Sequence, residues 1–206
     1  MPNIVFIGND NCLSEINPKN FLVFSSGDTV DFRGPCGGYE YQPNSTKYLT
    51  LVVGGMSCQP AIQIIREIMA NPKDQTSVTL VLCAARPADI PYLQELQKYA
   101  LHDKRLTASF TVFEVDCDDW KGGEGYIDAK HLSSTLPLPT ESSHRVVVCG
   151  GPRMALGVLQ GLRTLGYSSE KIFVYGQFGV QQIRAVYGKC AKLAEHRETH
   201  IINRYH

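Results

Sequence analysis

Between residues 48 and 178, the chain alternates short apolar runs with segments whose apolar residues recur every three or four positions. The short runs are continuously apolar, which is typical of strands buried on both faces of a parallel sheet. The periodic segments between them are typical of amphipathic helices. The predicted strands are 49–53, 78–82, 110–113, 145–149 and 171–175, and the predicted helices are 60–69, 92–101, 128–134 and 154–165.

This order of elements predicts an α/β fold with a five-stranded, parallel, doubly wound sheet. We expect the strand order 3-2-1-4-5, in which the first and fourth strands are neighbours. The first 47 residues differ, because their short apolar runs are broken by Gly, Pro and Asn, and they predict a short N-terminal antiparallel β segment. The sequence therefore divides into residues 1–47, the α/β region 48–178 and a tail, 179–206.

The tail contains a predicted helix over 180–194. Residues 184–206 carry five Lys or Arg against two Glu. Such a segment is either a solvated helix with a frayed end or a docking element for an acidic partner. The sequence leaves both interpretations open.

Composition narrows the class of protein. The chain is formally neutral, which argues against a nucleic-acid binder that depends on counterion release. No apolar run is long enough for a membrane span, and residues 1–4 (MPNI) do not resemble the start of a secretory signal. The seven cysteines include no C-x-x-C pair, so we expect reduced thiols rather than a zinc ribbon or a disulfide framework. These features favour a cytoplasmic protein.

A glycine-rich loop, 54–60 with the sequence GGMSCQP, joins the first predicted strand to the first predicted helix. Glycines at this position let a pyrophosphate approach the backbone, and the N–H groups of a helix start favour an anion. Pro60 suits the first helical turn, and Ser57 is placed to cap it. Many doubly wound folds have such loops without binding a nucleotide, so this loop alone leaves a structural turn and a binding site equally open.

A second loop, 149–154 with the sequence CGGPRM, follows the fourth predicted strand. In the expected strand order the two loops face each other at the topological switch point, where ligands of such sheets bind. Cys149 fits a small buried residue at a strand end better than a nucleophile, because no histidine lies in a recognisable motif with it. Asp116, Asp118 and Asp119 fit a solvated loop better than a metal site, since no further ligand has a recognisable spacing.

Five motifs, in order, resemble those of the NADH–cytochrome b5 reductase branch of the ferredoxin-reductase-like flavoenzymes. Segment 27–37 is similar to G-D-T-x-x-x-x-G-P-x-G, which ends the flavin domain of that family, and the loop 54–60 lies where the family has G-G-T-G-I-T-P. Segment 89–96 resembles D-I-x-x-x-x-E-L, segment 120–127 resembles W-x-x-x-x-G-[FY]-[VI], and segment 149–154 resembles C-G-P-P-x-M. The resemblance covers most of the chain up to Tyr175.

The resemblance implies hydride transfer from a nicotinamide to FAD, followed by single-electron transfer to an acceptor. It makes residues 1–47 a remnant of an FAD-binding β-barrel domain and 48–178 an NAD(P)H-binding domain. It places Cys149 near the reactive nicotinamide ring and Tyr126 beside the adenosine. The loop residues that it assigns to cofactor binding are Gly54, Gly55, Met56, Ser57, Gln59, Gly150, Gly151, Pro152 and Met154.

The cofactor preference depends on two charged residues. Glu114 falls where the family carries an acid associated with NADH rather than NADPH, and a carboxylate accepts from a ribose hydroxyl but repels a 2′-phosphate. Arg86, after the second predicted strand, is a competing feature because a guanidinium attracts that phosphate. We expect NADH as the preferred cofactor, with NADPH as the alternative.

The chain also departs from the family pattern. It has no match to R-x-[YF]-[ST], the family's flavin-binding motif, which leaves FAD without its usual residues. In the first loop, Met56, Ser57 and Gln59 replace Thr, Gly and Thr, changes worth about 1–3 kcal/mol of binding. One hypothesis is a reductase-like enzyme whose flavin is weakly bound, supplied by a flavin-bearing partner or encoded in a segment absent from this sequence, and which passes electrons to an electron-acceptor protein. The alternative is a non-catalytic relative that serves as a nucleotide-binding or protein-interaction module.

Overall fold

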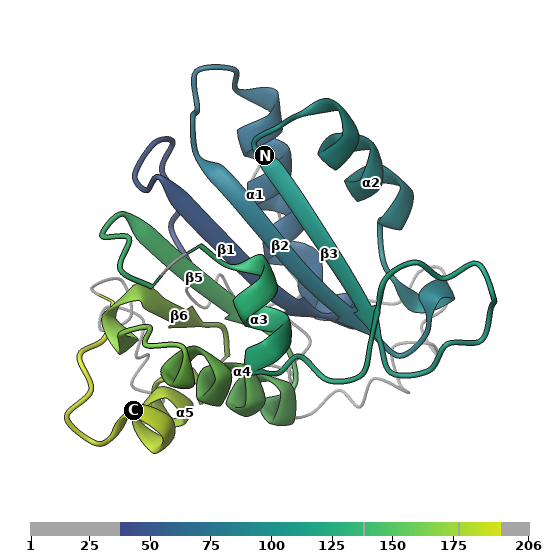
Figure 1. Ribbon diagram of the computed structural model, residues 1–206. Coiled ribbons are helices and arrows are strands. Elements are labelled where there is room, and N and C mark those ends of the chain that lie inside the picture. The colour runs from purple at the N-terminus through teal and green to yellow at the C-terminus, as the bar shows by residue number, and fades with distance from the viewer. Residues whose placement is uncertain (1–37, 138, 177, 195–206) are drawn as a thin grey trace, which may run out of the picture.

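A computed structural model describes residues 38–137, 139–176 and 178–194. The chain there forms one sheet of six parallel strands in the order β4-β3-β2-β1-β5-β6 (Figure 1). The strands are β1 (Tyr48–Gly54), β2 (Ser77–Ala84), β3 (Leu106–Val112), β4 (Gly123–Glu124), β5 (His144–Cys149) and β6 (Ile172–Val174). The α/β, doubly wound fold class is thereby confirmed, and the five predicted strands lie in the expected relative order.

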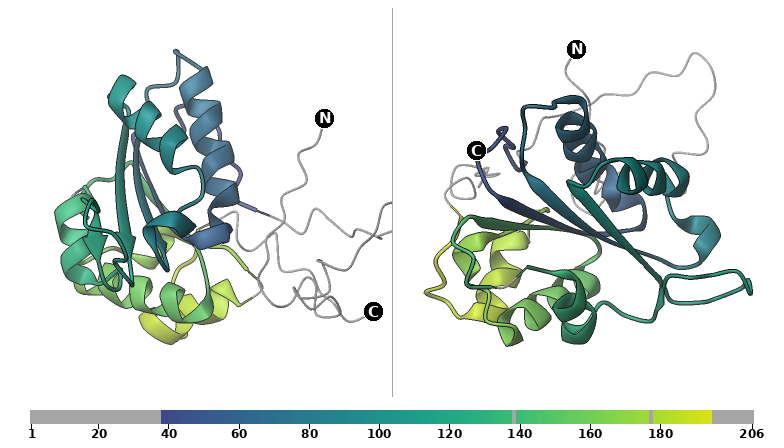
Figure 2. Two further views of the ribbon diagram at one scale, coloured as in Figure 1. Left: turned by 90° about the vertical axis from the view of Figure 1, so that its right-hand side faces the viewer. Right: turned by 45° about the horizontal axis from the view of Figure 1, so that its top comes forward.

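Helices cover both faces of the sheet, as the edge-on view in Figure 2 shows. The first face packs α1 (Gln59–Ala70) and α2 (Leu93–His102), and the second packs α3 (Ala129–Thr135), α4 (Pro152–Thr164) and α5 (Gly179–Tyr187). Three short 3₁₀ turns lie between these elements: η2 (Gly55–Cys58), η3 (Pro87–Asp89) and η4 (Ser169–Lys171).

The sheet divides the apolar core into two layers, because successive side chains of a strand point to opposite faces. In β1, Leu49 and Leu51 join the cluster under α1 and α2, whereas Val52 joins the cluster under α3, α4 and α5. All three side chains have an exposed fraction of 0%. Burial on both faces explains why the central strands are continuously apolar.

Two details of the fold differ from the prediction. The sheet has a sixth strand, β4, which pairs with the carboxyl end of β3 through Gly123 and Glu124. The helix expected over 180–194 ends at Tyr187, because Gly188 takes a φ of +98° that an L side chain rarely adopts. The predicted N-terminal antiparallel segment falls mainly on residues 1–37, outside the described residues.

Residues 38–47 pack against the amino ends of the strands and the β6 side of the sheet. The backbone N–H of Tyr39 donates to the hydroxyl of Tyr175 over 3.1 Å. The hydroxyl of Tyr41 donates to Asp74 Oδ2 over 2.6 Å and lies 2.9 Å from Thr76 Oγ1. Asp74 and Thr76 are fully buried. This short segment is therefore bonded to the α/β region, and the domain boundary at residue 47 stays a prediction.

Candidate nucleotide-binding site

The candidate site lies where the two glycine-rich loops leave neighbouring strands. β1 pairs in parallel with β5, and Val53 is in register with Cys149. A Cβ atom built on Gly150 would lie only 3.6 Å from the backbone nitrogen of Gly54. The chain thus brings the loops 54–60 and 149–154 together at the carboxyl edge of the sheet, at the switch point where doubly wound folds bind ligands.

Two of the glycines have open space on the side where a side chain would lie. Within the described residues, and apart from their chain neighbours, no heavy atom lies within 4 Å of a Cβ built on Gly55 or Gly151. Gly55 also has a φ of +50°, in the left-handed region that favours glycine. A ligand can approach the backbone closely at both positions, as a pyrophosphate requires.

The helices that begin at these loops have uncapped amino ends. In the described part of the chain, neither α1 nor α4 has a side-chain cap hydrogen bond, and neither has an acidic residue in its first turn. In contrast, Asp128 caps α3 by accepting from the backbone N–H of His131 over 2.9 Å. Helix amino ends without a carboxylate attract anions from outside. Two of them border this crevice.

Ser57 does not play the predicted capping role. Residues 55–58 form the 3₁₀ turn η2, which leads directly into α1 at Gln59, so the N-cap residue is Cys58 and not Ser57. Pro60 does occupy the first turn of α1, as predicted, and Pro152 occupies the equivalent place in α4. The prolines suit these positions because the first N–H groups of a helix have no intrahelical acceptor.

Cys149 ends β5 with its thiol in the core layer under α1 rather than on the surface. Its exposed fraction is 1%. Burial, together with the nearby Cys58 thiol, raises the pKa of Cys149 to about 12. A thiol held protonated at neutral pH is a poor nucleophile, so Cys149 packs beneath the second loop and does not provide thiolate chemistry.

The other residues of the first loop point in different directions. Met56 is exposed, with 72% of its surface accessible, and Ser57 is half-buried. Gln59 Nε2 donates to the hydroxyl of Tyr92 over 3.0 Å. The ring of Tyr92 in turn lies under the guanidinium of Arg66, 5.1 Å from its centre. The Gln59 side chain is therefore already engaged with the turn before α2. The sequence analysis missed Tyr92, a non-glycine residue with a φ of +57°.

Glu114 and Arg86, which the sequence analysis treated as competitors, form an ion pair. Arg86 Nε lies 3.0 Å from Glu114 Oε2, and both side chains are more than half exposed. Arg86 follows β2 and Glu114 follows β3, so the carboxyl ends of neighbouring strands bring them together. In the absence of a ligand, the charge of each side chain is therefore partly neutralised by the other.

Tyr126 is the most accessible aromatic side chain among the described large hydrophobic residues, at 79% exposed. Its ring packs against Phe113, with centroids 4.7 Å apart, and Phe113 is itself exposed. The loop between them is held by Trp120, whose indole N–H donates to the carbonyl of Gly123 over 3.0 Å. The sequence analysis did not assign Phe113 to the site, although its position directly after β3 was a usable signal.

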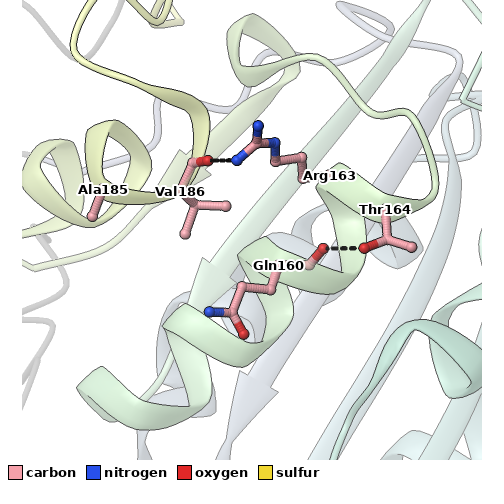
Figure 3. Close-up of a pocket in the computed structure, with 5 residues that line it drawn as sticks. All are labelled: Gln160, Arg163, Thr164, Ala185 and Val186. Atoms are coloured by element: carbon pink, nitrogen blue, oxygen red, sulfur yellow. Dashed lines mark hydrogen bonds between the residues drawn. The ribbon is translucent and has the colours of Figure 1, made fainter.

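Other candidate features lie apart from this crevice. The pocket drawn in Figure 3 is formed between α4 and α5 by Gln160, Arg163, Thr164, Ala185 and Val186. Arg163 donates there to the Val186 carbonyl, which ties α4 to α5. Within residues 38–137, 139–176 and 178–194, no three His, Cys, Asp or Glu side chains gather as they would around a metal ion.

Comparison with known proteins matches residues 51–160 to the family model described as the oxidoreductase NAD-binding domain. That segment is more than half of the chain and includes both glycine-rich loops. The chain belongs to the oxidoreductase NAD-binding domain family. The expected resemblance to NADH–cytochrome b5 reductases is also confirmed.

Two curated relatives illustrate the relationship. NADH-cytochrome b5 reductase 1 of Laccaria bicolor is 32% identical over 157 residues, which cover 72% of this chain and 51% of that protein. The plasma membrane-associated coenzyme Q6 reductase of Saccharomyces cerevisiae is 36% identical over 165 residues, covering 76% of this chain and 52% of that protein. The chain therefore spans about half the length of the curated relatives it matches.

Among solved structures, the chain is similar to the cytochrome b5 reductase domain of Ulva prolifera nitrate reductase. The TM-score is 0.69 at 25% identity, over 76% of this chain and 64% of that chain. The human Ncb5or CS-b5R domains in their NAD+ form share the fold, with a TM-score of 0.57 and 24% identity. These matches agree with the observed sheet.

No helix in the described part of the chain has the length and hydropathy needed to cross a membrane.

Proposed function

We propose that this NAD-binding domain binds NADH in the crevice between the loops 54–60 and 149–154 and supplies hydride to a flavin, which passes electrons to an acceptor. The observation that carries the proposal is the pair of uncapped helix amino ends, α1 and α4, beside the uncovered backbone of Gly55 and Gly151. This arrangement suits a pyrophosphate, because bare N–H groups and two helix dipoles favour an anion.

The remaining parts of the dinucleotide have fitting neighbours along the same edge. Phe113 and Tyr126 offer exposed aromatic surface against which an adenine can stack. Glu114 is placed to accept from a ribose hydroxyl, provided that it gives up its ion pair with Arg86. Cys149 and Gly150 form the inner end of the second loop, where the family places the nicotinamide.

We infer that the site prefers NADH to NADPH, and that this preference is smaller than it would be if Glu114 were not paired with Arg86. A lone carboxylate repels the 2′-phosphate of NADPH, but Arg86 offsets that charge at 3.0 Å. The two side chains are exposed, so solvent screens the pair and either partner can turn toward a ligand.

The flavin is proposed from the class of the relatives, because the sequence has no match to the family's flavin-binding motif. The acceptor is proposed only by class, from relatives named as reductases of cytochrome b5 and of coenzyme Q6. A cytoplasmic location likewise stays a proposal.

A second function, binding without turnover, is favoured by one observation. Met56, Ser57 and Gln59 replace the small and hydroxyl-bearing residues of the family loop, and Gln59 is bonded to Tyr92 rather than turned toward the crevice. A module of this kind keeps the nucleotide, or a partner protein, but transfers no hydride.

The test combines absorption spectroscopy with calorimetry on the purified chain. NADH binding is measured by titration calorimetry, and the visible spectrum is recorded after incubation with FAD and desalting. The proposal expects NADH binding and a flavin band that NADH bleaches. If NADH binds and no flavin band is retained, the flavin must come from a partner, and failure of NADH to reduce added free FAD then favours the module. Absence of NADH binding by a folded chain overturns the proposal and the nucleotide-binding form of the module. Gly150→Leu, checked for folding by circular dichroism, serves as the blocked control.

A further inference from the structure

Met154, in the first turn of α4, has its thioether lodged between the two glycine-rich loops. A Cβ atom built on Gly54 would lie 2.6 Å from Met154 Sδ, and one built on Gly150 would lie 2.3 Å from it. Both distances are well inside van der Waals contact, so any side chain at either position would displace the sulfur. The Cys83 thiol lies 3.7 Å from the same sulfur. One atom thus contacts the carboxyl ends of β1, β2 and β5.

This contact gives Gly54 and Gly150 a reason to be glycine that differs from the reason at Gly55 and Gly151. The latter two face open space, where a ligand can lie. The former two face the methionine. Gly54 and Gly150 must lack a Cβ because the side chain of Met154, rather than a phosphate, occupies the space beside them.

We propose that Met154 is a positioning residue, a spacer that fixes the separation of the loops 54–60 and 149–154 and thereby the affinity for the nicotinamide dinucleotide. The inference rests on the proposed function. A thioether suits the role because methionine is unbranched and polarizable, so it fills an irregular gap between backbones without a hydrogen-bonding requirement. Binding groups must be held within about 0.5 Å of the productive geometry, and loops that lose their spacer lose that precision.

The experiment is a double-mutant cycle between Gly54→Ala and Met154→Ala, read as the dissociation constant for NADH from calorimetry. We expect Met154→Ala to weaken NADH binding about tenfold and Met154→Leu, which conserves volume, to stay within about threefold of the wild type. Gly54→Ala should weaken binding about tenfold in the wild type but no more than about twofold in the Met154→Ala background, where the sulfur no longer obstructs the methyl group.

Adenosine, which lacks the phosphates, provides the readout that separates positioning from a general loss of structure. Its proposed contacts, Glu114 and Tyr126, follow β3 and β4, away from the thioether. Adenosine affinity should therefore change little in the variants that fold. Met154→Val, which keeps more apolar volume, replaces Met154→Ala in the cycle if the alanine variant does not fold.

The outcomes distinguish the two proposals. If the wild type binds NADH and Met154→Ala leaves the affinity unchanged, the methionine has no positioning role; if the affinity increases, the methionine obstructs the site. Either result overturns the inference while the proposed function stands. Equal effects of Gly54→Ala in both backgrounds would also overturn it. If the wild type itself does not bind NADH, the proposed function fails and the positioning role fails with it.

Discussion

At the amino end of the sheet, buried polar groups are bonded to one another, whereas at the carboxyl end the backbone is left open beside two helix starts. Asp74, fully buried at the amino end, accepts from the hydroxyl of Tyr41 and the backbone N–H groups of Thr76 and Asn44. At the opposite end, Gly55 and Gly151 face space that no described residue fills. One end satisfies its polar groups internally, and the other keeps them available for a ligand.

This contrast between the two ends of the sheet indicates which substitutions should affect stability and which should affect ligand affinity. The hydrogen-bond network around Asp74 should contribute to stability, because removing one partner leaves buried polar groups without a hydrogen bond. It lies at the opposite end of the sheet from the crevice, so it should contribute nothing to ligand binding. An open, uncapped edge contributes to binding at some expense of stability, because caps that would stabilise it are missing. Mutations at the two ends should therefore separate stability from affinity.

The largest effect is expected at Asp74. Asp74→Ala leaves the Tyr41 hydroxyl and the Thr76 N–H without their acceptor in a buried site, and it should lower the free energy of unfolding by about 3–5 kcal/mol. Urea unfolding measures this loss, and NADH affinity should stay within about twofold. Asp74→Asn keeps the shape and one acceptor and serves as the matched control. A large change in affinity with little loss of stability would contradict the separation of the two ends.

His144, buried at the start of β5, should make stability depend on pH. Burial, with the charges of Lys171 and Arg145, lowers its pKa from 6.5 to about 4. The unfolded chain therefore binds a proton between pH 6.5 and 4 that the folded chain refuses, so the stabilisation is complete above pH 6.5 and is lost as the pH falls toward 4. The loss amounts to about 3 kcal/mol.

The measurement is urea unfolding at a series of pH values for the wild type and for His144→Gln. The glutamine retains a donor for Thr50, which lies 2.9 Å from the histidine ring nitrogen, but it does not titrate. The difference between the two curves isolates His144 from the carboxylates. Parallel curves would show that His144 has the same pKa in the folded and the unfolded chain, which would contradict the prediction.

Gly151→Asp should raise the stability of the fold and lower its affinity for NADH. Gly151 is the N-cap residue of α4 and has backbone angles that other residues adopt without strain. An aspartate there caps the helix and should raise the free energy of unfolding by a few tenths of a kcal/mol. Its charge beside the pyrophosphate should weaken NADH binding by about thirtyfold. Gly151→Asn, the uncharged cap, should stabilise similarly and lose less affinity; equal affinity loss in both variants would point to bulk rather than charge.

The smallest expected effect concerns cofactor preference. Glu114→Gln removes the carboxylate that we propose contacts the ribose and frees Arg86 for a 2′-phosphate, so the ratio of NADPH to NADH affinity should rise about fivefold. Arg86→Gln should shift the ratio the other way. The two dissociation constants, measured at low and high salt, check the prediction, and a ratio that neither variant changes would place the 2′ position elsewhere.

The sequence alone was sufficient for the arrangement of the major strands, because continuous apolar runs and helical periodicity both derive from burial. It also located both glycine-rich loops. It missed β4, since Gly123 and Glu124 pair with β3 through backbone alone and leave no apolar pattern. It also extended α5 past Tyr187, because the conformation of Gly188 does not follow from composition.

Within the candidate site, the sequence identified residues but not their partners. Arg86 and Glu114 were both named as competing determinants, and only the fold shows that neighbouring strands pair them. Ser57 was assigned to a cap because its residue type is right, but it lies within the η2 turn and the N-cap of α1 is Cys58. The contact of Met154 with Gly54 depends on the packing of α4 over β1, which no local pattern encodes.

The pairing of β1 with β5 also sets when the crevice can come into being during folding. Val53 and Cys149, which are in register, are nearly half the chain apart in sequence. Closing such a long loop is slow compared with forming a helix or a local strand pair. The first glycine-rich loop is synthesised and can be structured well before the second exists, so the crevice appears only with the completed central sheet. Any nucleotide that binds there selects chains that have finished folding and shifts the population toward them.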